Sequence, residues 1–66
     1  MNMIGENIKK IRKKKGISQD KLSKLADVTL TTLTKIETGI NTNPTVNTMQ
    51  KIAKALGVSV DSLLKT

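Results

Sequence analysis

The chain has 66 residues, with 12 Lys and Arg against 5 Asp and Glu for a formal net charge of +7, and it contains no His, Cys, Phe, Tyr or Trp. A chain of this length forms one domain, which we expect to span residues 1–66, and it leaves little room for an enclosed active site. The missing His and Cys exclude a disulfide framework, a Cys/His zinc site and an imidazole or thiol catalytic pair, so we expect no enzyme, no metal and no cofactor.

The excess of positive charge indicates a polyanionic partner, because Lys and Arg attract phosphate groups. The absence of aromatic residues disfavours single-stranded nucleic acid and membrane interfaces, where aromatic rings commonly stack or anchor. The sequence shows no apolar run near 18 residues and no secretory signal pattern, so we expect a cytoplasmic protein with no membrane partner. Duplex DNA is therefore the partner that the composition favours.

The N-terminal half of the chain predicts two amphipathic helices. The first is expected over about 3–15, and Gly16 follows it in a position suited to a left-handed helix end. Its apolar residues recur at i, i+4 and i+7: Ile4, Ile8 and Ile11. The second helix is expected over 19–26 after the N-cap residue Ser18. Its apolar residues are Leu22, Leu25 and Ala26.

Three further helices are expected in the C-terminal half. One covers 30–38 after the N-cap candidate Thr29, the next begins after Thr45 and ends at Gly57, and a short last one begins after Ser59. Short helices with tight connections predict an all-α orthogonal five-helix bundle rather than an up-and-down coiled coil. The predicted core comprises Ile4, Ile8, Ile11, Leu22, Ala26, Val28, Leu33, Ile36, Val46, Met49, Ile52, Ala53, Leu56, Val58, Val60 and Leu63.

The predicted 30–38 helix has two distinct faces. Successive residues of a helix are separated by about 100°, which places Leu33 and Ile36 on one edge. The opposite edge carries Thr31, Thr34, Lys35 and Thr38. Short hydroxyls, methyl groups and one long cation suit the major groove of DNA, where thymine methyls accept apolar contact and base edges accept hydrogen bonds.

Residue types and spacing along essentially the whole chain resemble the phage-repressor and Cro family of helix-turn-helix proteins. The matching positions are Ile11-Arg12, Gly16-Ile17-Ser18-Gln19, Leu22, Ala26, Val28-Thr29, Thr32-Leu33-Thr34, Ile36-Glu37, Gly39, Pro44, Lys51-Ile52-Ala53, Ala55-Leu56-Gly57-Val58 and Leu63-Leu64. The resemblance implies a lambda-repressor-like fold whose second and third helices form the helix-turn-helix. It also implies a transcriptional regulator that binds double-stranded DNA, with repression favoured over activation.

The resemblance implies which individual residues of this chain contact DNA. The residues that match base-reading positions are Leu30, Thr31, Thr34 and Lys35. Those that match backbone-contact positions are Gln19, Thr29 and Thr38, and the loop adds Asn41, Thr42, Asn43 and Thr45, in a stretch without Lys or Arg. Two alternatives remain: Leu30 at the border of the apolar arc could be a core-edge residue, and Gln19 could be only a first-turn residue.

Two structural features also follow from the resemblance. Arg12 and Glu37 are expected to form an ion pair between the first and third helices, the alternative being two unrelated surface charges. Asp27 occupies a turn position that is usually glycine, where the left-handed conformation costs an L-residue about 1 kcal/mol. The basic run 9–15 is expected to contribute mainly long-range attraction or a solvated helix face.

A chain of this size has one reading helix, so we expect a weak homodimer on a pseudo-palindromic site with half-sites about 34 Å apart. The expected dimer surface is Val58, Val60, Ser62 and Leu64. No small-molecule ligand is expected. A second hypothesis is an antitoxin-like or regulatory module that binds a protein through the same fold, which a weak salt dependence would reveal. Membrane association through the first helix is disfavoured because its isoleucines are needed in the core.

Overall fold

The computed structural model describes residues 4–65, and these residues form five α-helices and no strand. The helices are α1 (Ile4–Lys14), α2 (Gln19–Ala26), α3 (Leu30–Glu37), α4 (Val46–Leu56) and α5 (Val60–Leu64). The predicted all-α five-helix class is confirmed. Two boundaries differ by one residue, since Lys15 and Thr38 lie just outside α1 and α3, and the predicted start at Met3 lies outside the described residues.

Helices α2 to α5 each begin at a hydroxyl residue that caps the first turn. The side-chain oxygen accepts a hydrogen bond from the backbone N–H three residues later, which satisfies one donor that has no partner within the helix. The four pairs are Ser18 with Lys21, Thr29 with Thr32, Thr45 with Thr48, and Ser59 with Ser62. Local sequence therefore sets where these helices start.

The turn between α2 and α3 contains a strained residue. Asp27 has φ 57° and ψ 45°, the left-handed conformation, and it is the only non-glycine residue with positive φ in residues 4–65. Its backbone N–H closes the end of α2 on the carbonyls of Ser23 and Lys24. The expected left-handed turn at Asp27 is confirmed.

We predict that Asp27→Gly raises the melting temperature by about 2–8 °C, since a domain of this size gains about 4–8 °C per kcal/mol. Release of left-handed strain, roughly 1–2 kcal/mol, should exceed the added entropy of the unfolded chain, roughly 0.5–1 kcal/mol. Thermal unfolding followed by circular dichroism measures the change. Asp27→Asn is the control, because it removes the charge while keeping a side chain. An unchanged or lower melting temperature for Asp27→Gly would contradict the strain argument.

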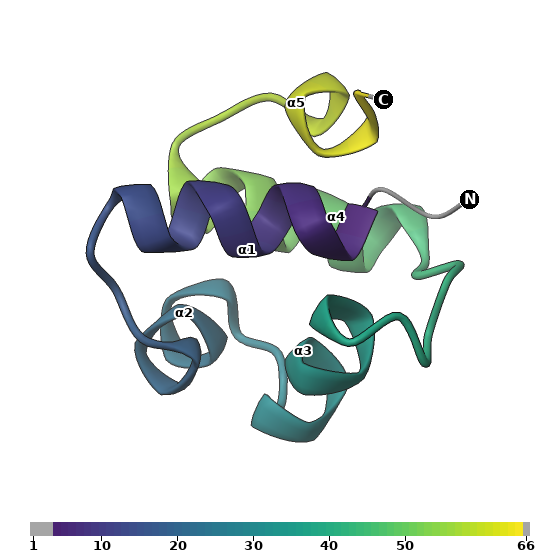
Figure 1. Ribbon diagram of the computed structural model, residues 1–66, viewed down its shortest axis with the longest axis horizontal. Coiled ribbons are helices and arrows are strands. Elements are labelled where there is room, and N and C mark those ends of the chain that lie inside the picture. The colour runs from purple at the N-terminus through teal and green to yellow at the C-terminus, as the bar shows by residue number, and fades with distance from the viewer. Residues whose placement is uncertain (1–3, 66) are drawn as a thin grey trace.

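A single core joins all five helices. Seven large side chains are completely buried: Ile8, Leu22, Leu33, Ile36, Ile52, Leu56 and Leu63. In Figure 1, α1 crosses the middle of the molecule in front of α4, with α5 on one side and α2 and α3 on the other. Packing a central helix between two layers buries its apolar stripe and places the helix-turn-helix at one end of the bundle.

Most predicted core residues are buried or pack against the core, but Val46 does not. The partly buried members are Ile4, Ile11, Val28, Val58 and Val60. Val46 is 63% exposed, so its assignment to the core was wrong. It is the first residue of α4, almost a turn before Met49, the first buried residue of that helix. Periodicity indicates which side of a helix faces inward, but not how far along the helix its neighbours extend.

Two contacts of α1 have no counterpart among the sequence predictions. Gly5 is buried where α1 crosses α3, and a Cβ atom on it would overlap the carbonyl oxygen of Ile36. Asn7 donates from Nδ2 to the carbonyl oxygens of Leu63 at 2.9 Å and Lys65 at 2.7 Å, which binds the C-terminal end of α5 to α1. Both contacts fix the orientation of α1 between the two layers.

Candidate nucleic-acid interface

Helices α2 and α3 pack against each other, and their inner faces share the core. Leu22 and Ala26 of α2 and Leu33 and Ile36 of α3 are all buried. The short connection through Asp27 leaves the two helices in contact with each other. A pair of short helices held this way has the form of a helix-turn-helix, in which the second helix can present its outer face to a partner.

The outer face of α3 carries the residues predicted to read bases. Thr31 and Lys35 are exposed, and Thr34 is partly buried beside them. Leu30 is 43% exposed at the start of α3, so part of its side chain is open to a partner, and both its base-reading and its core-edge assignments stay predictions. The face therefore offers methyl groups, hydroxyls and one cation, as expected from the sequence.

The hydroxyl groups of Thr29 and Thr38 already bond within the protein. Thr29 Oγ1 accepts from the backbone N–H of Thr32 at 3.1 Å and donates to Thr32 Oγ1 at 2.8 Å. Thr38 Oγ1 donates to the carbonyl oxygen of Thr34 at 2.9 Å. A phosphate contact at Thr29 would therefore be made more readily by the N–H groups of the first turn of α3, which have no acceptor within their helix.

The loop after α3 is held by hydrogen bonds to α3 and to a side chain of its own. The N–H of Asn41 donates to the carbonyl oxygen of Lys35 at 2.9 Å, and Asn41 Oδ1 accepts from the N–H of Asn43 at 3.0 Å. Thr42 and Asn43 are exposed, while Thr45 is exposed but uses its hydroxyl to cap α4. Thr42 and the Asn43 side chain are thus the loop groups best placed for an outside partner.

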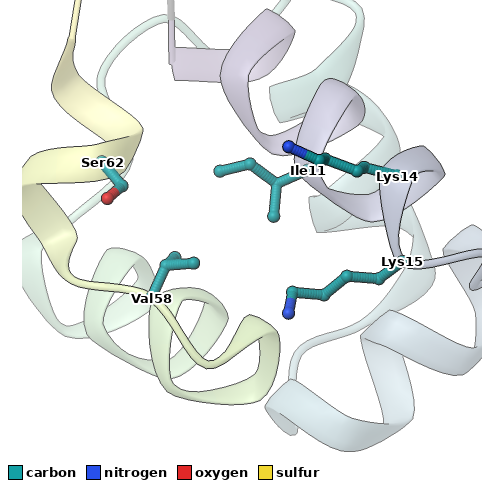
Figure 2. Close-up of a pocket in the computed structure, with 5 residues that line it drawn as sticks. All are labelled: Ile11, Lys14, Lys15, Val58 and Ser62. Carbon is teal, nitrogen blue, oxygen red and sulfur yellow. The ribbon is translucent and has the colours of Figure 1, made fainter.

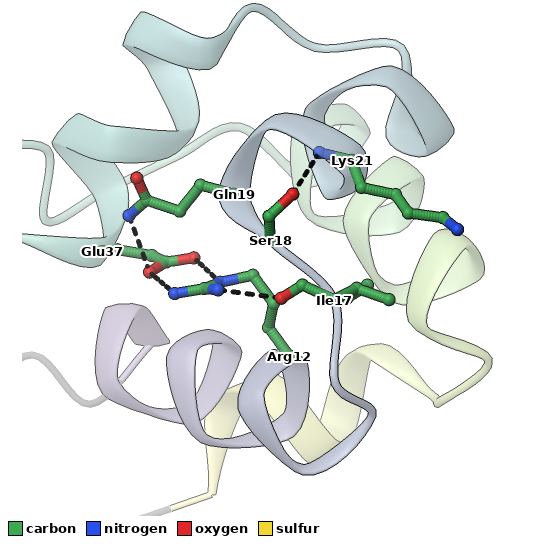
Figure 3. A network of polar contacts seen from close by, with 6 residues as sticks. All are labelled: Arg12, Ile17, Ser18, Gln19, Lys21 and Glu37. Atoms are coloured by element: carbon green, nitrogen blue, oxygen red, sulfur yellow. Dashed lines mark hydrogen bonds and ion pairs between the residues drawn. The ribbon is translucent and has the colours of Figure 1, made fainter.

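A buried ion pair lies between α1 and the C-terminal end of α3 (Figure 3). Arg12 Nε donates to Glu37 Oε2 at 2.9 Å, and a second guanidinium nitrogen donates to Glu37 Oε1 at 3.0 Å. The side chains of Arg12 and Glu37 are only 10% and 2% exposed, so they are not unrelated surface charges. Arg12 also donates to the carbonyl oxygen of Ile17 at 2.9 Å, which ties the α1–α2 connection to the same group.

Gln19 joins this ion pair, a connection that sequence reasoning missed. Its Nε2 donates to Glu37 Oε1 at 3.0 Å, and the residue is half-buried at the start of α2. A side-chain amide has two N–H donors, so one remains for an outside acceptor. No sequence signal could have found this contact, because only the helix packing brings the first turn of α2 within reach of the end of α3.

The predicted dimer residues lie on α5 and the connection before it. Val58 and Val60 pack partly against the core, Ser62 is half-buried, and Leu64 is 46% exposed. They do not belong to α2, α3 or the loop after α3. The structure thus separates the proposed reading helix from the proposed contact between copies.

The remaining cations are mostly unpaired. Within residues 4–65, ion pairs join only Arg12 to Glu37 and Lys24 to Asp20, the latter exposed at 3.2 Å. In the same range no helix is long and apolar enough to cross a membrane. No group of Asp and Glu among the described residues gathers in a way that could hold a metal ion. Most of the positive charge is therefore available to attract a polyanion from solution.

The family model named Helix-turn-helix matches residues 8–63, and the chain therefore belongs to this helix-turn-helix family. Among curated proteins, it is 42% identical over 62 residues to the HTH-type transcriptional regulator SinR of Bacillus subtilis (strain 168). That match covers 94% of this chain but 56% of SinR, so the chain spans about half the length of this relative.

Solved structures show the same fold. A crystal structure of SinR, described as the master regulator for biofilm formation, in complex with DNA has a TM-score of 0.92 and 41% identity, covering 96% of this chain and all of that one. The restriction-modification controller protein C.AhdI from Aeromonas hydrophila has a TM-score of 0.87 and 26% identity, covering 92% of this chain and 91% of that chain. The lambda-repressor-like arrangement implied by the resemblance is confirmed at the level of the fold.

Proposed function

We propose that the chain is a sequence-specific duplex-DNA-binding domain of a transcriptional regulator that acts in the cytoplasm, more often as a repressor than an activator. The observation that carries this proposal is the match of nearly the whole chain, at 41% identity and a TM-score of 0.92, to SinR in complex with DNA. The exposed face of α3 supplies the reading surface, and the unpaired lysines supply attraction to phosphates.

In this proposal, Leu30, Thr31, Thr34 and Lys35 contact base edges. Leu30 and the threonine methyls suit the methyl group of thymine, and Lys35 suits the O6 and N7 acceptors of guanine. The Arg12–Glu37 pair is buried at the C-terminal end of α3 and makes no contact with DNA in this proposal. Its role is to hold α3 at a fixed angle to the rest of the bundle, so that the reading residues meet the groove together.

Phosphate contacts frame the reading helix. Gln19 would donate its second amide N–H, Thr29 would use the N-terminal turn of α3, and Thr38 would bind beside the end of that helix. The loop residues Asn41, Thr42, Asn43 and Thr45 would also contribute, chiefly through Thr42 and the Asn43 side chain, because the N–H groups of Asn41 and Asn43 and the Thr45 hydroxyl already bond within the protein. These contacts set the register of the protein on DNA but carry no sequence information themselves.

One chain has one reading helix, so we propose that two chains bind a pseudo-palindromic site together. The two copies would contact each other through Val58, Val60, Ser62 and Leu64. Two half-sites would lie about 34 Å apart, one turn of DNA. The surface is small, and the dimer is expected to assemble fully only on DNA. Sedimentation of the protein with a two-site duplex should show two chains per duplex, and a single chain at saturation would refute the dimer.

Selection of bound sequences from random duplex DNA tests the proposal as a whole. The expected product is a two-fold related site, and its affinity should fall with salt with a log–log slope near −0.9 times the number of phosphates contacted. An interface with a protein partner, built on apolar anchors, would depend much less on salt. Failure to enrich any sequence would contradict the proposal that α3 recognises specific bases.

We predict that Lys35→Ala relaxes the preference at one or two base positions of the selected site, with a loss of discrimination of about 1–3 kcal/mol there. Lys14→Ala is the matched control, because Lys14 is exposed on α1 and should weaken binding to all sequences alike. Fluorescence anisotropy with the selected duplex and its single-base variants measures both. The reverse pattern would overturn the assignment of α3 to the groove.

A further inference from the structure

A groove lies between the C-terminal end of α1 and the connection from α4 to α5. It has a volume of about 490 Å³, within the range of about 300–1,000 Å³ typical of small-molecule sites. Its lining residues are Ile11, Lys14, Lys15, Val58 and Ser62. None of them belongs to α2, α3 or the loop after α3, so the groove is separate from the reading surface.

The lining combines an apolar floor with a positive rim. Ile11 and Val58 are partly buried against the core and are therefore held in place. Lys14 and Lys15 are exposed, and neither has a carboxylate within ion-pairing distance in residues 4–65. Figure 2 shows the five side chains around one opening, with no acidic residue among them.

Ser62 adds a hydroxyl on the side of the groove that faces the two lysines (Figure 2). Its Oγ lies 3.2 Å from Ser59 Oγ, and either oxygen can be the donor, so the hydroxyl of Ser62 can turn its proton toward the groove. Two ammonium groups and one hydroxyl offer more donors than acceptors. This arrangement favours an anion over a cation or a neutral polar group.

The sequence predicts no small-molecule ligand, but from the lining of this groove we propose that it binds a small amphiphilic carboxylate. The carboxylate lies on the side of the opening that Lys14 and Lys15 form, and its hydrocarbon chain extends over Ile11 and Val58 toward Ser62 (Figure 2). A simple anion would use only the lysines and leave the apolar floor exposed to water, while a neutral apolar molecule would leave the ammonium groups without a counter-charge. Only a ligand with both parts satisfies the whole lining, because apolar burial and charge-assisted hydrogen bonds then act together.

The groove overlaps the proposed dimer surface, so a ligand bound there would affect dimer formation. Val58 and Ser62 belong both to the groove lining and to the proposed dimer surface. A carboxylate in the groove would therefore compete with the second copy and weaken binding to a two-site duplex, an effect that rests on the proposed function. Binding to the groove itself does not depend on DNA and can be measured without it.

Titration of the ¹⁵N-labelled 66-residue protein with decanoate, below the concentration at which it forms micelles, tests the site. Amide shifts should concentrate at the five lining residues and saturate. Decanol, which has the same chain without charge, and acetate, which has the charge without the chain, should each bind at least about tenfold more weakly. If decanol binds as tightly as decanoate, the lysines contribute nothing and the groove is only an apolar surface. If acetate binds as tightly, the apolar residues contribute nothing and the lysines only attract counter-ions. Either result overturns the proposal.

A variant pair identifies the residues responsible. Lys14→Gln with Lys15→Gln should weaken decanoate binding about fivefold or more, whereas Lys51→Gln with Lys54→Gln should leave it unchanged although the same net charge is lost. All four lysines are exposed, so both variants should fold, which circular dichroism verifies. Equal weakening by both variants would show a general charge effect. That result would contradict the proposal. The proposed dimer would itself make the shifts of Val58 and Ser62 depend on protein concentration, and decanoate should then reverse those shifts; a failure to reverse them would also contradict the proposal.

Discussion

Gly5→Ala is expected to lower the free energy of unfolding by about 3 kcal/mol or more, at the upper end of the cost of overpacking a core. The added methyl group would overlap the carbonyl oxygen of Ile36, and Glu37 Cα lies 3.1 Å away from the same position. Both are backbone atoms of α3 and cannot turn aside as a flexible side chain would. To make room, α1 must move away from α3, which strains the Arg12–Glu37 pair and opens the core around Ile8.

Helix propensity alone predicts the opposite result. Alanine is favoured over glycine inside a helix by about 1 kcal/mol, so the sign of the change separates local preference from packing. Urea unfolding of the variant measures it. Gly16→Ala is the control, because Gly16 has φ 71° and a Cβ atom there would meet nothing within 4 Å, so it reports backbone strain without overlap. A Gly5→Ala cost no larger than that of Gly16→Ala would show that α1 and α3 are not held in close contact.

Glu37→Gln is expected to destabilise the protein by about 3–5 kcal/mol, the usual cost of leaving a buried charge without its partner. Arg12 would remain 8% exposed with a neutral amide in place of the carboxylate that now accepts from it. A domain of this length has a total stability of roughly 3–10 kcal/mol, so much of the variant would be unfolded at 25 °C. Gln19 would also lose its charged acceptor, which loosens the start of α2.

Two further variants make this result specific to the buried pair. Asp20→Asn breaks the exposed pair with Lys24 and should cost less than about 1 kcal/mol. Arg12→Met combined with Glu37→Leu should recover much of the loss, because no charge is then left unpaired in the interior. Urea unfolding compares all three. A cost below about 1 kcal/mol for Glu37→Gln would mean that the guanidinium remains hydrated, which contradicts its burial.

The helices were largely predictable because their signals are local. A Ser or Thr just before apolar residues with helical spacing marks the start of a helix, because its side-chain oxygen can accept a hydrogen bond from the backbone N–H three residues later. Ser18, Thr29, Thr45 and Ser59 all cap helices as expected. Asp27 could be placed in a left-handed turn only because the family resemblance puts glycine at that position.

The polar contacts between helices were only partly predictable. The resemblance implied the Arg12–Glu37 pair, but nothing in the residue pattern indicated that Gln19 bonds to the same carboxylate. No sequence pattern indicated the roles of Asn7 and Gly5. Asn7 donates hydrogen bonds to the C-terminal end of α5, and Gly5 allows α3 to pack closely against α1. Each of these contacts joins residues far apart along the chain, so the two positions have no fixed spacing that a pattern could register.

The amino-acid sequence by itself determined the helices, their caps and the excess of positive charge, since each depends on neighbouring residues or on composition alone. The tertiary structure decided how closely α1 crosses α3, that Val46 stays outside the core, and which lysines share a groove with Ile11 and Val58. These features depend on where one helix ends against another, and that distance follows from the packing of all five helices together.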